Sequence, residues 1–273
     1  MVTQVEKASA FAALHEADET FVMGNAFDGC SARMLESLGF SAIATSSWVQ
    51  AALLGKNDGE TTREEALLHA HKLVMATDLP VSADLEKGFG DSAEDVAQTI
   101  SAAGSIGLVG GSIEDATGDP SQPIYDMDHA AMRIEAAAAA ASGLPFKFTL
   151  TARSENFVRG ISDLDDTIAR LQAFEAAGAD VLMAPGLPDL DAVKRVCSSV
   201  SKPVNFMAGI PGCSFSVSDL AQAGVKRVSL ATSLYAYAMA AALEAAKEIS
   251  EQGTFGYIDR LAGVDLGRFL SSP

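Results

Sequence analysis

Short apolar runs alternate with amphipathic stretches along nearly the whole chain, and this alternation limits the possible folds more than any other feature. It indicates a parallel sheet with crossover helices. The predicted strands are at residues 21–26, 42–46, 81–85, 108–113, 147–152, 181–184, 204–208 and 227–231. The predicted helices are near residues 29–38, 62–76, 92–103, 127–142, 163–177, 188–199, 216–223 and 233–250. Eight such repeats favour a closed (β/α)₈ TIM barrel of the α/β class over a doubly wound sheet, which usually has fewer strands and a glycine-rich first turn.

The length of 273 residues fits one such barrel, which typically needs roughly 250 residues, or two smaller domains. No stretch rich in Pro, Gly and Ser divides the chain, so residues 1–273 are predicted to form a single domain with its barrel core at about 20–250. The residues before Phe21 are expected to form an extra helix that closes the bottom of the barrel. A C-terminal helical extension is expected. The tail at 251–273 mixes apolar residues with glycines and is expected to pack against another surface, which the sequence does not identify.

The charge and the cysteine content narrow the classes of partner. A net charge of −17 would repel nucleic acid and anionic membrane surfaces, whereas a small carboxylate substrate stays possible because local cations can invert the field in a pocket. The N-terminal segment lacks a signal-peptide pattern, and no apolar run reaches the roughly 18 to 20 residues of a membrane span. Cys30, Cys197 and Cys213 are widely spaced and suggest neither zinc nor a disulfide framework. A reducing, cytoplasmic location is therefore expected.

Acidic side chains follow consecutive predicted strands at the end where a parallel barrel builds its active site. Asp84 and Glu86 are two residues apart, so in an extended strand both would face the same way, and Glu114 and Asp115 end the next strand. Acids that face one point repel unless a cation lies between them. Asp84, Glu86 and Glu114 are therefore predicted to bind Mg²⁺ or Mn²⁺, which prefer oxygen ligands. The alternative is that they are solvated loop acids in an acidic protein.

A second group of strand-end residues is suited to binding a carboxylate. Arg153 offers a planar fork to a carboxylate, and Thr45, Ser46 and Ser47 offer hydroxyl and amide groups, with Trp48 shaping the pocket. Asn205 comes from the seventh predicted strand and is expected at the same mouth. For Arg153 the alternative is a buried ion pair with Glu155 or Asp180.

The polar loop over residues 51–62 could bring Asp58 and Lys56 to the same pocket, although an ordinary solvated loop is an equal alternative. The histidines fall on or beside predicted helices, where surface or interhelical roles are usual. Neither a nucleophilic triad nor a nucleotide-binding fingerprint is present.

Several motifs, in this order, resemble the isocitrate lyase/phosphoenolpyruvate mutase superfamily over about residues 24–237. They read GNAFDGCSARMLESLGFSAIATSSW, DGETTREE, VSADLEKGFG, GSIEDATG, LTARSENF and PVNFMAG. The resemblance implies a (β/α)₈ barrel, often a homotetramer that exchanges its C-terminal helix, with Mg²⁺ bound to a 2-oxo acid or its enolate. Carried over by position, Asp84 would be the direct metal ligand, and Glu86 and Glu114 would hold the metal through water. Asp58 would match the acid at the rim of the metal site, and Ser46, Ser47 and Arg153 would hold the substrate carboxylate, with Asn205 nearby.

The loop after the fourth strand departs from the family pattern. Family lyases that cleave isocitrate or methylisocitrate carry a Lys-Lys-Cys-Gly-His type segment there, whereas this loop reads DATGDPSQPIYDMD, without Cys, Lys, Arg or His before His129. A metal-dependent lyase of a small 2-oxo or 2-hydroxy acid is therefore expected, with oxaloacetate decarboxylation ranked first because it needs only an electron sink and a proton. Asp58, Arg153 and Glu114 are its predicted catalytic residues. Phosphonomutase chemistry, with Lys56 or Arg159 as the cation, and a non-catalytic 2-oxo-acid and Mg²⁺ binding protein are the alternatives.

Overall fold

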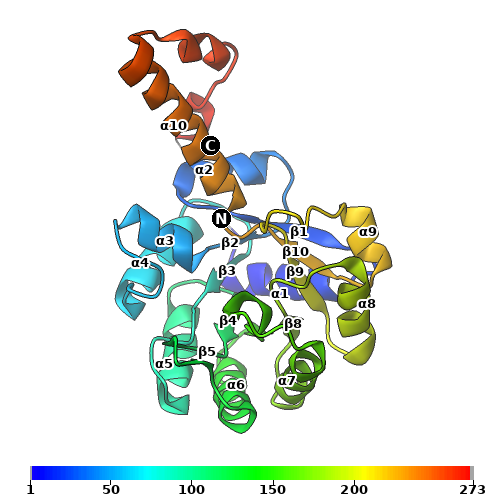
Figure 1. The fold of residues 1–273 in the computed structure, drawn as a ribbon. Helices are drawn as coiled ribbons and strands as arrows, with labels where there is room; N and C mark the ends of the chain where they lie inside the picture. The colour runs from blue at the N-terminus through cyan, green and yellow to red at the C-terminus, as the bar shows by residue number, and fades with distance from the viewer. Residues whose placement is uncertain (1, 271–273) are drawn as a thin grey trace.

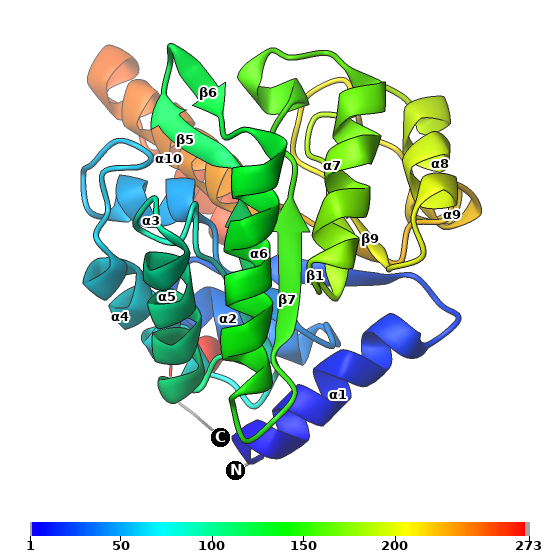
Figure 2. The same ribbon diagram turned by 90° about the horizontal axis from the view of Figure 1, so that it is seen from below.

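The computed structural model describes residues 2–270, and its centre is a closed barrel of eight parallel strands (Figures 1 and 2). The (β/α)₈ prediction is confirmed. Around the barrel the strands follow the order β1, β10, β9, β8, β7, β4, β3 and β2. Their bounds are β1 Phe21–Asn25, β2 Ile43–Ala44, β3 Val81–Asp84, β4 Gly110–Glu114, β7 Thr149–Arg153, β8 Val181–Met183, β9 Val204–Met207 and β10 Arg227–Ser229.

The strand register brings the predicted site residues to one end of the barrel. Asp84 pairs with Ser112 across β3 and β4, and Glu114 pairs with Arg153 across β4 and β7. Both β4 and β7 extend one residue further than expected, to Glu114 and Arg153. The three charged residues Asp84, Glu114 and Arg153 are therefore the last residues of adjacent strands.

Helices on the outside cover the strands and begin at side chains that cap them. Asp28, Thr62, Ser92 and Ser216 each accept a hydrogen bond from a backbone amide in the first turn of a helix, an interaction that stabilises a helix by about 1 kcal/mol. The outer helices are α2 Gly29–Ser37, α4 Arg63–Val74, α5 Ala93–Ser105, α6 Met127–Ser142, α7 Leu164–Ala176, α8 Leu190–Ser199 and α9 Val217–Gln222.

A helix and a hairpin were not expected from the sequence. Helix α3 (Ser47–Leu53) begins directly after β2, with Ser46 as its capping residue, so the first residues of the predicted 51–62 loop are helical. The segment after β4 forms an antiparallel hairpin of β5 (Ala116–Asp119) and β6 (Gln122–Ile124) outside the barrel.

The expected N-terminal helix is present as α1 (Gln4–Glu16), which crosses the bottom of the barrel in Figure 2. Its Phe11 is fully buried in a cluster with Met23 of β1, Ala44 of β2 and Val109, which directly precedes β4. Helix α1 therefore closes the end of the barrel opposite the predicted site.

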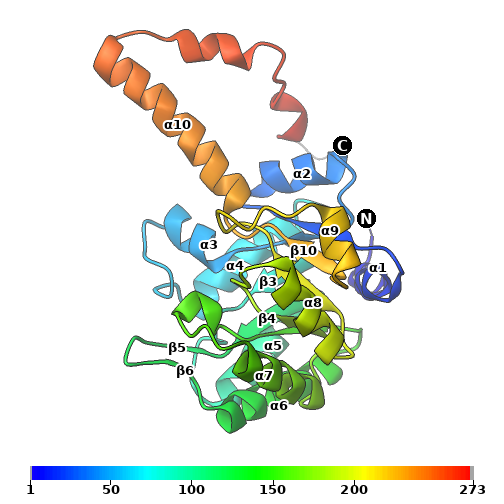
Figure 3. The same cartoon turned by 45° about the vertical axis from the view of Figure 1, so that its right-hand side comes forward.

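The C-terminal part leaves the barrel as an arm (Figures 1 and 3). Helix α10 (Ser233–Gln252) has no buried residue, and the short helices η2 (Gly256–Leu261) and η3 (Gly267–Phe269) lead the chain back to α2. There Phe269 is buried and its carbonyl accepts a hydrogen bond from Arg33 Nε at 2.6 Å. Among the described helices, none has both the length and the apolar character that crossing a membrane would require.

Candidate active site at the carboxyl ends of the strands

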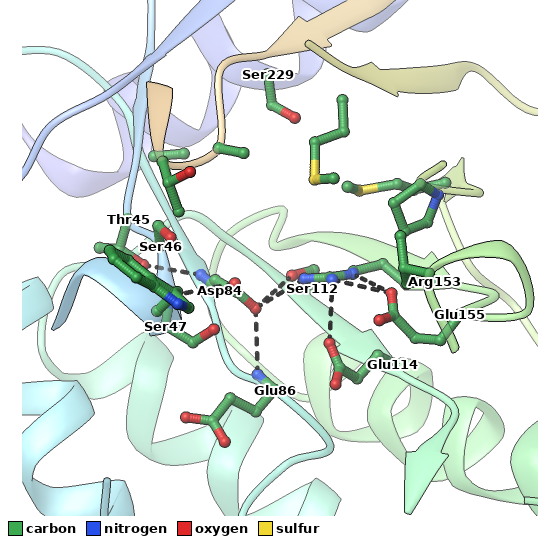
Figure 4. Close-up of a pocket in the computed structure, with 18 of the residues that line it drawn as sticks. Thr45, Ser46, Ser47, Asp84, Glu86, Ser112, Glu114, Arg153, Glu155 and Ser229 are labelled. Carbon is green, nitrogen blue, oxygen red and sulfur yellow. Dashed lines mark hydrogen bonds and ion pairs between the residues drawn. The ribbon is translucent and has the colours of Figure 1, made fainter. Parts of the chain in front are cut away.

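A cavity of about 710 Å³ opens where the barrel strands end (Figure 4). The predicted site residues Thr45, Ser46, Ser47, Trp48, Asp58, Asp84, Glu86, Glu114, Arg153 and Asn205 all line it. A loop, a helix start and five strands or strand ends supply these residues. The fold therefore brings together every residue that was predicted to bind metal or substrate or to act in the favoured lyase reaction.

Arg153 lies among the acids of the site (Figure 4). Its Nη1 is 3.0 Å from Asp84 Oδ1, and its Nη2 is 3.2 Å from Glu114 Oε2 and 2.9 Å from Glu155 Oε1. Of the two alternative ion-pair partners of Arg153 that the sequence suggested, Glu155 is therefore in contact with it. Asp180 instead pairs with Lys147, with 2.5 Å between Oδ1 and Nζ. The substrate role of Arg153 stays a prediction, because its guanidinium is already occupied by three carboxylates.

Asp84 is held by several donors besides Arg153. Its carboxylate accepts hydrogen bonds from the amides of Ser47 and Glu86, at 3.2 and 3.3 Å. Burial alone would raise the pKa of Asp84, but Arg153 and these amides outweigh it and lower the pKa below its usual value. Asp84 is therefore ionised, as a metal ligand must be.

Glu86 reaches the cavity by a different geometry from the one predicted. Strand β3 ends at Asp84, and Glu86 has a left-handed backbone with φ of 50°, so the argument from an extended strand was wrong for this residue. Such a backbone costs a non-glycine residue about 1 kcal/mol and is common at functional sites. Burial raises the pKa of Glu86 to about 7. The hydrogen bond that Thr61 Oγ1 donates to Glu86 Oε1 at 2.8 Å acts in the opposite direction but is the smaller effect.

Two other acids of the cavity also have raised pKa values. Burial, and then the nearby Glu155, raise the pKa of Glu114 well above its usual value, while burial and then Asp84 raise the pKa of Asp58. The 51–62 loop places Asp58 at the cavity, which was one of the two alternatives weighed from the sequence. Lys56 does not line the cavity, and its Nζ instead lies 2.6 Å from Glu65 Oε1.

These carboxylates suit a divalent cation. Hard oxygen donors are the ligands that Mg²⁺ and Mn²⁺ prefer, and a cation would favour the ionised form of these acids against the burial and the repulsion that raise their pKa values. Within residues 2–270, no three acidic, histidine or cysteine side chains are already grouped around one metal position. Asp84 and Glu114 contact Arg153 instead, so a cation at these acids requires Arg153 to shift.

The sequence matches the family model described as phosphoenolpyruvate phosphomutase over residues 11–250. The chain belongs to this family. It is 29% identical to the oxaloacetate decarboxylase of Paraburkholderia xenovorans, over 87% of this chain and 80% of that protein, and 29% identical to the 2-methylisocitrate lyase of Shewanella oneidensis, over 81% and 78%. These relatives confirm the predicted superfamily and support an enzyme of the lyase or mutase kind.

Solved structures of the phosphoenolpyruvate mutase family share the fold. A protein from Burkholderia cenocepacia, assigned only provisionally as a lyase or mutase, has a TM-score of 0.96 and 48% identity, covering 99% of this chain and 98% of its own. The 2,3-dimethylmalate lyase has a TM-score of 0.87 and 25% identity, covering 99% and 96%. The resemblance therefore extends through nearly all of the chain.

Asp115 was expected at the mouth of the barrel in this member of the phosphoenolpyruvate mutase family, and that expectation was wrong. Its side chain is buried, with Oδ2 3.1 Å from Arg170 Nη1 and Oδ1 accepting the amide of Glu155 at 2.8 Å. Burial raises the pKa of Asp115 to about 6, although the Glu155 amide and Arg170 oppose it. Asp115 holds the ends of β4 and β7 together rather than lining the cavity.

Sequence reasoning missed other residues that line the cavity of this family member. Ser112, Arg227 and Ser229 were not considered, and Glu155 was expected at the mouth of the barrel with no role beyond an ion pair with Arg153. Ser112 precedes Glu114 by two positions and Ser229 follows Arg227 by two, so the two-residue period of a strand was the signal that could have found them.

Proposed function

We propose that this protein is a metal-dependent lyase that breaks a carbon–carbon bond in a small 2-oxo or 2-hydroxy acid, with decarboxylation of oxaloacetate as the first reaction to test. The observation that carries the proposal is the group of buried acids with raised pKa values, Asp58, Glu86 and Glu114, beside the ionised Asp84 in one cavity. The decarboxylase and the lyase among the relatives support this kind of reaction.

In this proposal Asp84, Glu86 and Glu114 hold the metal, which is Mg²⁺ or Mn²⁺. When bound, it supplies a Lewis acid that withdraws electron density from the substrate. Asp84 and Glu114 would then exchange their contacts with Arg153 for the cation. That exchange frees N–H groups of Arg153 for the substrate carboxylate, while Glu155, 2.9 Å from Nη2, keeps the guanidinium oriented.

The remaining predicted residues surround this centre. Thr45, Ser46 and Ser47 supply hydroxyl and amide donors, and Trp48 and Asn205 form part of the cavity wall around the substrate. Decarboxylation breaks the bond to the departing carboxylate, releases CO₂ and leaves a carbon that takes up one proton. Water can supply that proton, so the absence of Cys, Lys, Arg and His from 115–128 does not exclude this reaction.

Phosphonomutase chemistry is the second candidate because Arg159 lies at the cavity. Its side chain is 40% exposed and its Nη2 is 3.4 Å from Glu114 Oε1, so a phosphoryl group could recruit this guanidinium. The printed descriptions of the family model and of a Streptomyces platensis structure at 26% identity name this chemistry.

We further propose a homo-oligomer, a dimer or a tetramer, since α10 exposes a large apolar surface. A cytoplasmic location fits the three cysteines, all unpaired in the structure.

The deciding experiment is NMR of the purified protein with Mg²⁺ and oxaloacetate, 2-methylisocitrate, isocitrate, phosphonopyruvate or phosphoenolpyruvate. Asp84→Asn is expected to slow the consumption of the true substrate at least about a hundredfold, which corresponds to about 2.7 kcal/mol of activation free energy. Glu94→Gln, which removes an exposed acid on α5, serves as the matched control and should leave the rate unchanged.

The products separate the candidates. Pyruvate and CO₂ formed faster with wild type than with Asp84→Asn identify the decarboxylase, and conversion of phosphonopyruvate or phosphoenolpyruvate identifies the mutase. If nothing is consumed but 2-oxo acids still bind, the proposed activity is wrong and the protein is a binding protein.

A further inference from the structure

Arg227 lies on the inner side of the barrel and lines the same cavity as the carboxylates. It is the first residue of β10, and only 2% of it is exposed. Helix α1 lies beneath it, since His15 of that helix is 3.2 Å from Arg227 Nη1. Arg227 therefore marks the floor of the cavity.

The hydrogen bonds of this guanidinium go only to neutral groups. Nε donates to Asn205 Oδ1 at 2.7 Å, Nη2 donates to Thr151 Oγ1 at 2.9 Å, and Nη1 donates to His15 Nε2. An arginine carries five N–H donors, so two stay without a hydrogen-bond partner among the described residues.

No carboxylate of residues 2–270 pairs with Arg227, in contrast to Arg153 and Arg170. Arg153 contacts Asp84, Glu114 and Glu155, and Arg170 contacts Asp115 and Asp166. Burial lowers the pKa of Arg227 to about 9, and no acid opposes that effect. A buried charge without a counter-ion is costly, because its hydration is lost and nothing replaces it.

Small and polar side chains lie with Arg227 along the cavity wall. Ala44, Ser82, Ser112 and Ser229 line it, and Ser229 Oγ accepts a hydrogen bond from Asn205 Nδ2 at 3.0 Å. Figure 4 shows Ser229 across the pocket from Glu86 and Glu114. One ligand could thus reach both the acidic mouth and the cationic floor of the 710 Å³ cavity.

We propose that Arg227, with Ser229, forms an anion subsite at the cavity floor that takes a carboxylate of the bound ligand. This proposal rests on the proposed function, because it concerns a second anionic group of a ligand of the same cavity. At the mouth the acids already neutralise Arg153, so the unpaired positive charge of the cavity wall lies at its floor.

Calorimetric titration of the metal-free protein with succinate and with succinamide tests this subsite. The two probes have the same carbon skeleton, and only succinate carries carboxylates. Arg227→Gln is expected to weaken succinate binding at least tenfold and succinamide binding less than threefold. Arg195→Gln, which removes an exposed arginine of α8, should change neither affinity.

The outcomes also separate this subsite from the proposed activity, because the titration needs neither metal nor turnover. The proposal is overturned if Arg227→Gln binds succinate with unchanged affinity. It is also overturned if Arg159→Gln, and not Arg227→Gln, weakens succinate binding. If Arg227→Gln does not fold, wild-type crystals soaked in bromide decide. An anomalous peak within hydrogen-bonding distance of the Arg227 guanidinium supports the subsite, and the lack of one overturns it.

Discussion

His15 shows how one buried residue fixes its own protonation state. Its ring lies edge-on between Phe11 and Phe21, with Nδ1 2.8 Å from the Phe11 carbonyl and Nε2 facing Arg227. Because arginine can only donate, Nε2 must accept, and the proton therefore lies on Nδ1. Burial, and then the charge of Arg227, lower the pKa of His15 to about 3.

This depressed pKa predicts a loss of stability in mild acid. Below about pH 6.5 the unfolded chain binds a proton at His15 that the folded protein does not bind, so the free energy of unfolding falls as the pH drops from about 6.5 to about 3. His15→Gln keeps an acceptor but cannot titrate. Its cost in stability at pH 8 should shrink by about 2 kcal/mol at pH 5, measured by urea unfolding at both values. An equal cost at both pH values would show that His15 is not buried in its neutral form.

At the scale of elements, the pair of Asp115 and Arg170 joins β4, β7 and α7. Arg170 Nη1 donates to Asp115 Oδ2 at 3.1 Å and to the Tyr125 carbonyl at 2.8 Å, and Asp115 accepts the amide of Glu155. Removing one partner leaves a buried charge uncompensated, which is strongly destabilising.

Arg170→Met is therefore expected to lower the free energy of unfolding by about 3 kcal/mol, measured by urea denaturation. The double variant with Asp115→Asn should recover part of that loss, because it removes the stranded carboxylate. If the double variant is no more stable than the single one, the ion pair is not what stabilises the junction.

The sequence predicted the barrel and the main acids because both follow from local patterns. Alternating apolar runs predicted the strands, and strand ends indicated Asp84, Glu114 and Arg153. The hairpin of β5 and β6 was missed because its strands, ATGD and QPI, are only four and three residues long and show no alternation of apolar residues. Asp115 was misplaced because its direction depends on Arg170, which comes from a helix 55 positions later. Contacts of that kind leave no local pattern.

At the scale of the whole molecule, the arm after the barrel presents apolar side chains without a described partner. Tyr237 is 82% exposed, and Met239 and Leu243 are 50% and 56% exposed on one face of α10, four positions apart. Monomeric proteins rarely expose such contiguous apolar surface. Since the helix already stands away from its own barrel in Figure 3, a second copy of the chain can cover it.

We expect sedimentation of the wild-type protein to give a mass of two or four chains. Met239→Asp with Leu243→Asp should shift the protein towards the monomer, because burying two carboxylates in an apolar interface costs several kcal/mol. Ser250→Asp with Gln252→Asp adds the same charge at polar positions of α10 and should keep the oligomer. A wild-type monomer, or dissociation by both double variants alike, would contradict the arm as a specific interface. The helical circular dichroism of each variant checks that the barrel itself stays folded.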